Sequence, residues 1–193
     1  MATPKILVFS SSTRTGSHNT KLAALAAKYL TLADVDVTRI SLSDYPLPLY
    51  DADLDARTGQ PANALRLKQM IMAHHGVFIA SAEYSASVTP ILKNAIDWVS
   101  RVREKGDPSY AAFKNRVFAV SAASVGRGGG LRSIMALRQV LELGCGALVI
   151  PEVVAIPRAD QAFDDMDNIV DTHTANLFHG QLDRLVEMAR LMM

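Results

Sequence analysis

Lys5-Ile-Leu-Val-Phe-Ser-Ser-Ser-Thr-Arg-Thr-Gly-Ser-His-Asn19 is the stretch that decides the fold of this 193-residue chain. The apolar run over 6–9 has the length of a buried strand, and it breaks into hydroxyl side chains. Seven of the eleven residues from 10 to 20 are Ser or Thr, with Arg14 and Gly16 among them. A helical pattern follows, because positions 22, 25, 26 and 29 share one face. The stretch therefore predicts a strand, a polar loop and a helix.

A strand that passes through a polar loop into a helix can hold an anion. The start of the helix offers unpaired N–H groups and the positive end of the helix dipole. Hydroxyls add donors that suit a phosphate, and Arg14 can form a bidentate, charge-assisted pair with one. A simpler interpretation is that Ser17 or Asn19 caps the helix. Capping accounts for one residue only, so the loop is predicted to bind a phosphate group.

Composition places the chain among globular proteins. Of its residues 49% are hydrophobic and its net charge is +1, which suits one domain over residues 1–193 and gives no electrostatic argument for a nucleic-acid partner. No apolar run approaches the ~18 residues of a membrane span, and the start of the sequence lacks a signal-peptide pattern. The single cysteine, Cys145, is expected to be a buried core residue, and the chain is expected to be cytoplasmic.

Strand and helix patterns alternate five times along the chain. The expected strands cover residues 6–9, 35–40, 77–80, 116–121 and 147–150. Each is followed by a helical pattern, so we expect a parallel sheet with helices on both faces and right-handed crossovers. Five units of this length suit an α/β, flavodoxin-like three-layer sandwich, with a five-stranded parallel sheet in the order 2-1-3-4-5.

The segment from 43 to 61 reads as a long irregular loop that is functional or faces a partner. Within it, Asp51-x-Asp-x-Asp55 imitates the start of a calcium loop. The imitation fails at the sixth and twelfth positions, which hold Ala56 and Ala62 in place of Gly and Glu, so no metal site is predicted.

Two further predictions concern charged side chains on helices. His74 and His75 fall in the expected last turn of the second helix, where a histidine complements the helix dipole. Lys93, Asp97 and Arg101 are spaced four apart and predict an exposed ladder of ion pairs.

Three loops of unusual composition leave the first, third and fourth strands, beside the point where the strand order reverses. The first is rich in hydroxyls, residues 81–89 carry Glu83 and Tyr84, and residues 122–130 carry Ser124 and four glycines. None has the P-loop or the dinucleotide fingerprint. Ligands in open parallel sheets bind at this edge, and glycine lets a flat ring approach the backbone. A phosphate at one end and a flat polar ring at the other describe FMN.

With these motifs the sequence resembles the NADPH-dependent FMN reductase family, which includes chromate and quinone reductases, over about residues 6–163. The family motif Gly-Ser-Leu-Arg-x-x-Ser-x-Asn matches residues 11–19. Its motif Pro-Glu-Tyr-Asn, followed by Leu-Lys-Asn-Ala-Ile-Asp-Trp, matches residues 82–85 and 92–98, and the glycine-rich third motif matches residues 124–130.

The resemblance implies phosphate ligands in the first loop and ring contacts in the other two. The candidate cofactor-binding residues are Ser12, Arg14, Ser17, His18, Asn19, Ala82, Glu83, Tyr84, Ser85, Ser124 and Gly126. For His18, contact with the phosphate, contact with a partner subunit and exposure to solvent all stay open.

This chain departs from the family pattern at three positions. Ser11 replaces Gly, Ala82 replaces Pro and Ser85 replaces Asn. Proline would preorganise the second loop and asparagine would reach the flavin edge. Each departure is therefore expected to weaken flavin affinity or to shift its reduction potential.

The resemblance implies an FMN-containing oxidoreductase that takes hydride from NADPH or NADH and passes electrons to a small acceptor such as a quinone or free flavin. No acid, base or nucleophile is assigned, because the cofactor carries the chemistry. Alternatives are a non-enzymatic flavodoxin-like electron carrier or flavin-binding sensor, and an α/β module whose pocket has decayed. The family also implies a homodimer or homotetramer, in which the 43–61 loop or the acidic segment 164–171 reaches a neighbour.

Overall fold

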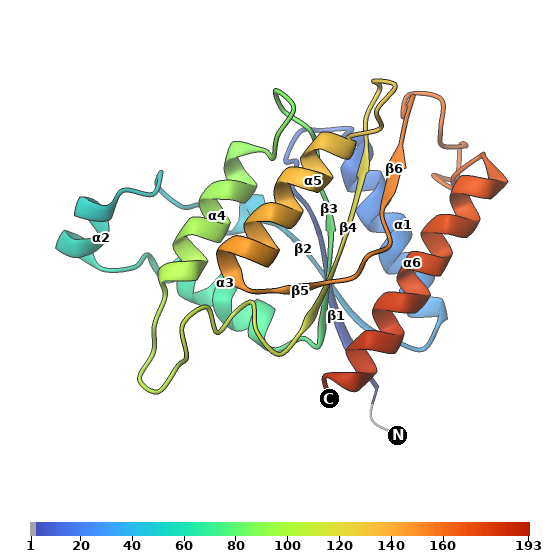
Figure 1. The fold of residues 1–193 in the computed structure, drawn as a ribbon. Helices are drawn as coiled ribbons and strands as arrows, with labels where there is room; N and C mark the ends of the chain where they lie inside the picture. Colours follow the sequence, from blue (N-terminus) through green and yellow to red (C-terminus); the bar gives the residue numbers. More distant parts are fainter. Residues whose placement is uncertain (1–2) are drawn as a thin grey trace.

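A parallel β-sheet forms the centre of the computed structural model, which describes residues 3–193 (Figure 1). Its strands are β1 (Lys5–Ser10), β2 (Asp36–Ser41), β3 (Gly76–Ala80), β4 (Val117–Ala123), β5 (Leu148–Val149) and β6 (Val154–Ile156). The path β2-β1-β3-β4-β5 confirms the predicted order 2-1-3-4-5, with all pairs parallel.

The sheet also contains a strand that the sequence analysis did not predict. β5 pairs with the first half of β4, from Val117, and β6 pairs with its last residues, Ser121 to Ala123. The chain leaves the sheet between these pieces, at Pro151, which has no N–H to give to a strand ladder. The predicted fifth strand over 147–150 is therefore one half of an interrupted edge.

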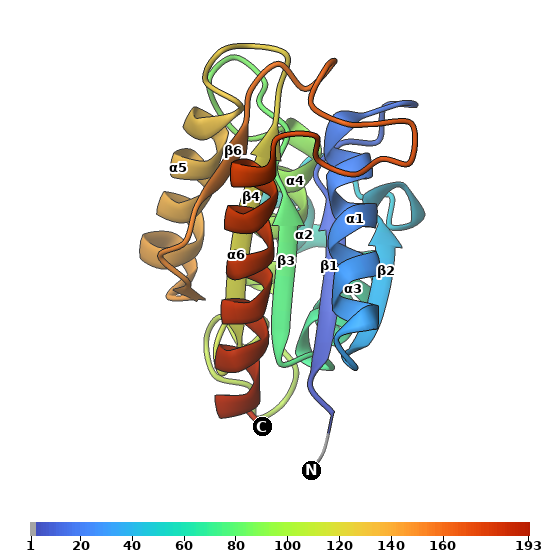
Figure 2. The same cartoon turned by 90° about the vertical axis from the view of Figure 1, so that its right-hand side faces the viewer.

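Helices cover both faces of the sheet, as expected (Figure 2). One face carries α1 (His18–Leu32) and α6 (Thr172–Leu191), and the other carries α3 (Ala62–Met72), α4 (Pro90–Arg101) and α5 (Leu131–Gln139). A π-helical turn, η2 (Val140–Gly144), continues α5.

Alternation along the strands divides the core into two layers. In β1, Ile6 and Val8 pack with α1 and α6, whereas Leu7 and Phe9 pack with the helices on the opposite face. Successive residues of a strand point to opposite faces of the sheet. Because the residues on both faces are apolar, both faces must be covered by helices. Cys145 is buried in the second layer, as predicted, and burial raises the pKa of its thiol to about 11.

The segment from 43 to 61 is more ordered than predicted. Its first residues belong to a short 3₁₀ turn, η1 (Leu42–Asp44), and it contains α2 (Ala52–Thr58). Asp51 is the N-cap of α2, and its Oδ1 accepts a hydrogen bond of 2.8 Å from the N–H of Leu54. The acidic run that imitates a calcium loop is thus the first turn of a helix, where carboxylates are favourable.

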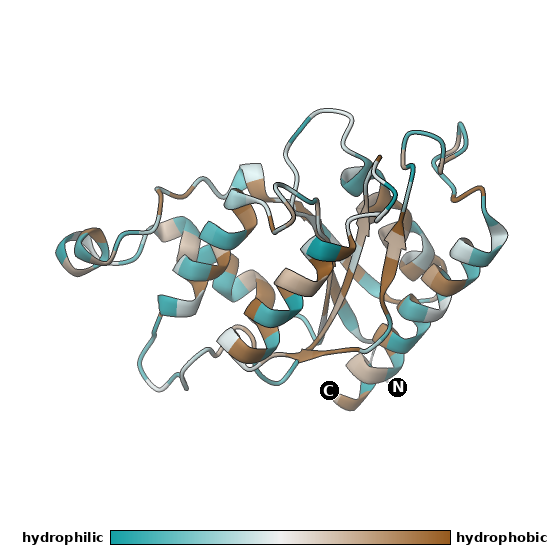
Figure 3. Cartoon of the chain, turned by 45° about the horizontal axis from the view of Figure 1, so that its top comes forward, coloured by the Kyte–Doolittle hydropathy of each residue, from teal (hydrophilic) through white to brown (hydrophobic). Residues whose placement is uncertain are grey.

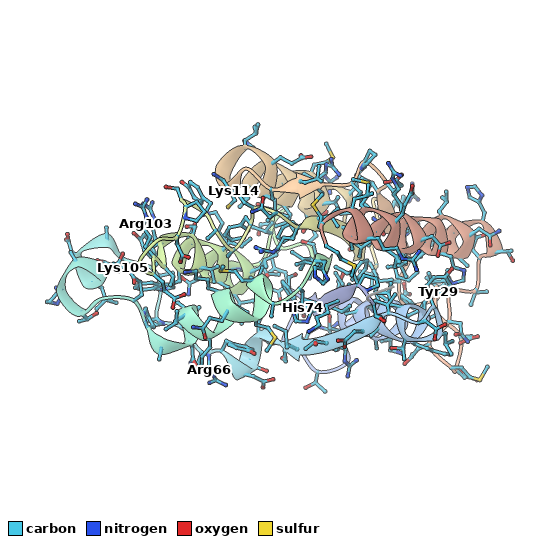
Figure 4. The ribbon with its side chains drawn as sticks, turned by 90° about the horizontal axis from the view of Figure 1, so that it is seen from below. Tyr29, Arg66, His74, Arg103, Lys105 and Lys114 are labelled. Atoms are coloured by element: carbon cyan, nitrogen blue, oxygen red, sulfur yellow. The ribbon has the colours of Figure 1, made fainter. Side chains whose placement is uncertain are left out.

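The two predictions about charged helix residues are only partly right. Lys93 pairs with Asp97 at 2.8 Å, but the Arg101 guanidinium lies over the Tyr50 ring, 5.7 Å from its centroid. His74 lies beyond the end of α3, and its Nδ1 is 2.6 Å from the Met70 carbonyl oxygen. Burial lowers the pKa of His74, so the ring caps the helix as a neutral donor, not as a cation. Figure 4, the view from below, labels this histidine. It lies just before β3, at the amino ends of the strands, whereas the three loops of unusual composition leave the carboxyl ends.

Candidate functional site

Three loops meet at the carboxyl ends of neighbouring strands: loop 1 (residues 11–17) after β1, loop 2 (81–89) after β3 and loop 3 (124–130) after β4. They lie together at the top of Figure 1, and Figure 3 shows this polar rim above the apolar strands. In open parallel sheets this edge is where ligands bind. The structure thus brings the three predicted loops together.

Loop 1 presents donors around the start of α1. The exposed Arg14 side chain folds back on its own loop, with Nη1 3.2 Å from the Thr15 carbonyl oxygen and Nη2 3.4 Å from that of Gly16. Ser17 is the buried N-cap residue of α1, and among residues 3–193 its side chain makes no capping hydrogen bond. The N–H groups of His18 and Asn19 belong to the first helical turn, where the helix itself offers no acceptor.

Loop 1 lacks acidic side chains, and its remaining polar groups are hydroxyls. Ser12 is buried, and its Oγ accepts a hydrogen bond of 3.4 Å from the N–H of Arg14, which leaves its own proton available. A guanidinium, free hydroxyls and helix-start N–H groups form a donor set that fits a phosphate dianion.

The Asn19 side chain is used inside the protein. Its Nδ2 donates to the Ala123 carbonyl oxygen at 2.8 Å, and its Oδ1 accepts from the Ala123 N–H at 2.9 Å. One proton of Nδ2 and one lone pair of Oδ1 are thus used inside the protein, and the role of this residue as a phosphate ligand stays a prediction. Asn19 fixes the start of α1 to the end of β4, just before loop 3.

Loop 2 is a tight hairpin that carries the predicted ring contacts. Tyr84 and Ser87 exchange two backbone hydrogen bonds of 3.0 Å. Between them Ser85 and Ala86 have φ values of 49° and 61°, the left-handed pair of a type I′ turn. The Tyr84 side chain projects from this hairpin and is 51% exposed.

The carboxylate of Glu83 holds loop 2 against α5. Its Oε1 lies 3.1 Å from Nη1 of Arg132, and its Oε2 accepts a hydrogen bond of 3.4 Å from the N–H of Ser133. A carboxylate at the start of a helix is favoured by the helix dipole. The side chain of Glu83 thus positions the loop, and contact of this residue with a ring stays a prediction.

Loop 3 uses its last glycines to pack against the sheet. A Cβ at Gly129 would lie 2.8 Å from the backbone of Ile156, and one at Gly130 would lie 2.6 Å from Cβ of Ala122. Both have positive φ, 61° and 87°. These two glycines are therefore required by close contacts with the Ile156 backbone and the Ala122 side chain, and the approach of a flat ring to this loop stays a prediction.

The first half of loop 3 is more open. Ser124 is anchored by its N–H, which donates to the Ile156 carbonyl oxygen at 3.0 Å. Its Oγ accepts a hydrogen bond of 3.4 Å from the N–H of Gly126. A Cβ at Gly126 would meet only that Oγ, at 3.8 Å, so the backbone here can be approached closely.

His18 faces a part of the chain that sequence reasoning did not connect with loop 1. Its ring is nearly parallel to that of Phe163, at an angle of 4° with the centroids 6.5 Å apart. Close by, Lys21 of α1 pairs with Asp167 at 2.6 Å. The acidic segment 164–171 thus contacts α1 of its own chain, and its contact with a neighbouring subunit stays a prediction.

Comparisons with known proteins agree with this geometry. A family model described as NADPH-dependent FMN reductase matches residues 4–161. An NAD(P)H-dependent FMN reductase of Pseudomonas aeruginosa is 35% identical over 183 residues, which cover 94% of this chain and 92% of that protein. A quinone reductase of Escherichia coli K12 is 31% identical over 181 residues, which cover 92% and 91%.

A solved structure shares the whole fold. FerB, a flavoenzyme NAD(P)H:(acceptor) oxidoreductase from Paracoccus denitrificans, has a TM-score of 0.77 and 28% identity, with 97% of this chain and 98% of that one covered. The family match spans most of the chain and includes all three loops of the site. The chain therefore belongs to the NADPH-dependent FMN reductase family.

Proposed function

We propose that loops 1, 2 and 3 bind FMN, with the phosphate on loop 1 and the isoalloxazine ring between loops 2 and 3. As a member of its family, the protein is an NAD(P)H-dependent flavin oxidoreductase with FMN as its cofactor. The observation that carries the residue assignment is the donor set of loop 1 at the start of α1, on the same edge as the other two loops.

The phosphate would be held by side chains and backbone of loop 1. Ser12 and Ser17 supply hydroxyl protons, and the first-turn N–H groups of His18 and Asn19 supply two more donors. Arg14 leaves its weak contacts with the loop carbonyls, at 3.2 and 3.4 Å, and turns onto the phosphate. The positive charge of Arg14 would then lie beside the phosphate dianion of FMN.

The ring would lie on the backbone of loops 2 and 3. The backbone from Ala82 to Ser85 borders one side, Tyr84 covers part of an edge, and Ser124 and Gly126 border the other side. When bound, FMN supplies the redox chemistry, accepting electrons from NAD(P)H and passing them to an acceptor. The residues of this chain bind and orient it, and none is assigned as an acid or a base.

The acceptor is proposed to be a small molecule such as a quinone or free flavin, and the electron donor NADPH or NADH. The similarity to a quinone reductase supports this choice. The exposed side of loop 2, where Tyr84 projects into solvent, leaves room for flat molecules to reach the ring in turn. Among residues 3–193, no helix is long and apolar enough to cross a bilayer. We propose that the enzyme works in the cytoplasm.

We also propose a homodimer or homotetramer. An open groove of about 700 Å³ runs between loop 2, the start of α4 and the α5–η2 helix, and its lining is mainly apolar. Leu143, which lines the groove, is 83% exposed, and Met135, next to the lining residue Ala136, is 56% exposed. Large apolar side chains gathered on one face favour burial against another surface. Sedimentation of the purified protein gives the subunit number.

The test of the function uses purified protein and two measurements. Titration with FMN, followed by quenching of flavin fluorescence, is expected to saturate at one flavin per chain. The loaded protein is then expected to oxidise NADPH or NADH steadily with a quinone as the acceptor and no other protein present. Failure to take up flavin at tens of micromolar would contradict the proposal. Binding without turnover would indicate a carrier or sensor.

A further inference from the structure

We propose that Ser11 and Ser133 are positioning residues that hold loop 2 in its cofactor-binding shape by bonding both polar groups of the Ala82 backbone. Ser11 Oγ accepts a hydrogen bond of 2.7 Å from the Ala82 N–H. Ser133 Oγ donates one of 2.9 Å to the Ala82 carbonyl oxygen. Both serines are completely buried. The inference rests on the proposed function in one respect, that loop 2 seats the flavin ring.

Ser11 joins loop 1 to both ends of loop 2. Its hydroxyl contacts Ala82 at the start of loop 2, and its carbonyl oxygen accepts a hydrogen bond of 2.7 Å from Oγ1 of Thr89, the last residue of that loop. Its own N–H donates to the Ala80 carbonyl oxygen at 2.9 Å, which extends the pairing of β1 with β3. Every polar group of Ser11 thus points at loop 2 or at the strand that leads into it.

Ser133 makes the matching connection from α5. The Ser133 hydroxyl gives its proton to Ala82, so the Ser81 hydroxyl, 2.6 Å away, must donate to it. The N–H of Ser133 also donates to Glu83 at 3.4 Å. The start of α5 therefore contacts three consecutive residues of loop 2, at 81, 82 and 83.

The arrangement gives a common explanation for two departures from the family pattern. Proline at position 82 would fix the backbone angle but has no N–H, and glycine at position 11 has no hydroxyl. Here Ala82 has an N–H that is buried and needs an acceptor, and Ser11 supplies it. Ser11 has ordinary backbone angles, since the positive φ values among residues 3–193 lie elsewhere. The hydrogen bond between Ser11 and Ala82 thus fixes the backbone of loop 2 at position 82, which in the glycine–proline pattern is fixed by the proline ring.

Sterics make the two positions interdependent. The Cδ atom of a proline at 82 replaces the amide hydrogen, and in this structure that hydrogen points at Ser11 Oγ across a donor–acceptor distance of 2.7 Å. Ala82→Pro alone therefore produces a clash, and Ser11→Gly alone leaves a buried N–H without a partner. In the double variant there is neither a hydroxyl for the proline ring to clash with nor an N–H left without an acceptor.

The experiment measures loop 2 directly in the apo protein and separately measures flavin binding. Hydrogen–deuterium exchange of the peptide spanning 81–89 is compared in the wild type, S11G, S133A, A82P and S11G/A82P, and FMN Kd is determined for each. We expect faster exchange and a Kd about tenfold higher for S11G and S133A, from loss of a buried hydrogen bond. A82P is expected to be worse than S11G, and S11G/A82P to return close to the wild type.

The matched control is Ser121→Ala. Ser121 is equally buried. Its carbonyl oxygen accepts a hydrogen bond of 2.7 Å from the N–H of Ser81, which Ser121→Ala keeps, whereas the hydroxyl that the variant removes donates to Gln181 of α6 and does not contact loop 2. This variant is expected to lower the melting temperature without changing exchange in loop 2 or FMN Kd. Unchanged exchange and Kd in both S11G and S133A would overturn the proposal, as would a double variant no better than A82P.

The two proposals can fail separately. If the wild type takes up no FMN, the proposed function fails, whereas the exchange rates of the apo variants still decide whether the serines hold loop 2. If A82P does not fold, S11G and S133A carry the test by themselves.

Discussion

Asn19 and Ala123 lie 104 residues apart in the chain and form a closed pair of hydrogen bonds, 2.8 and 2.9 Å long. The side-chain amide of one residue thus satisfies the N–H and the carbonyl of the other, in a buried position between α1 and β4. The pair sets the distance between loop 1, where the phosphate is proposed to bind, and loop 3, which borders the ring.

Asn19→Ala is therefore expected to affect both stability and cofactor binding. It leaves a buried N–H and a buried carbonyl without partners, which costs ~2–4 kcal/mol of unfolding free energy. Urea unfolding of the apo protein measures this cost, and FMN titration is expected to show weaker binding. Asn63→Ala is a suitable control, because that exposed amide donates to the Pro46 carbonyl oxygen and accepts from Arg66, and neither residue belongs to loops 1, 2 or 3. Equal losses in the two variants would argue against a special role for Asn19.

Arg14→Ala tests the phosphate site. The side chain is exposed and its contacts with Thr15 and Gly16 are long, so the melting temperature of the apo protein should hardly change. FMN Kd is expected to rise ~10- to 100-fold, from loss of a charge-assisted contact with the phosphate. Riboflavin, which lacks the phosphate, should bind both forms equally. Arg57→Ala on the exposed α2 is the control, and unchanged FMN affinity in Arg14→Ala would reject the assigned site.

Ala86→Gly is expected to stabilise the hairpin of loop 2. Ala86 has φ of 61°, a left-handed conformation that costs a non-glycine residue ~1 kcal/mol and costs glycine nothing. Ser85→Asn, at φ of 49°, should act in the same direction, because asparagine tolerates this region well. Thermal unfolding measures the gain.

The same Ala→Gly change at Ala56, inside α2, should have the opposite sign, because glycine in a helix costs ~1 kcal/mol. A loss of stability in both variants would mean that the type I′ turn of loop 2 does not form. A gain in stability together with tighter FMN binding would show that the turn geometry favours the cofactor.

His74 is expected to make the fold sensitive to mild acid. Burial lowers its pKa below 6.5, so between that value and the folded-state pKa the unfolded chain binds a proton that the folded chain does not. The contribution of neutral His74 to the free energy of unfolding is therefore fully present above pH 6.5. It is lost as the pH falls from 6.5 through the folded-state pKa. Urea unfolding at about pH 7.5 and pH 5.5 measures this difference.

His74→Gln provides the comparison, since glutamine can still donate to the Met70 carbonyl but does not titrate. Its stability should change less than that of the wild type between the two pH values. A variant in which the exposed His173 is replaced should keep the wild-type dependence. An identical pH dependence in His74→Gln would place the titrating group elsewhere.

The layers, the strand order and the position of the three loops could be predicted because they depend on local patterns. Continuous apolar runs such as 6–9 mark strands covered on both faces, and their order along the chain limits the topology. Chemistry that depends on a distant partner could not be predicted. From the sequence Asn19 is a candidate helix cap or phosphate ligand, and nothing near it shows that its amide also bonds Ala123. In the same way, nothing near Gly129 in the sequence reveals the backbone of Ile156.

Short elements were missed for a different reason. α2 has seven residues and depends on its Asp51 cap, and β6 has three residues beyond a proline, so neither gives a clear periodic signal. The turn in loop 2 was missed because Ser85 and Ala86 are not the residues that usually adopt left-handed angles.

The divided edge formed by β5 and β6 has a consequence for solubility. A long exposed strand is a template on which further chains can add, and this leads to aggregation. Here the outer edge consists of β5, with two residues, and β6, with three, and Pro151 lies between them. An incoming strand would find too few consecutive partners on this side to extend the sheet, so the enzyme is protected there against fibre-like growth.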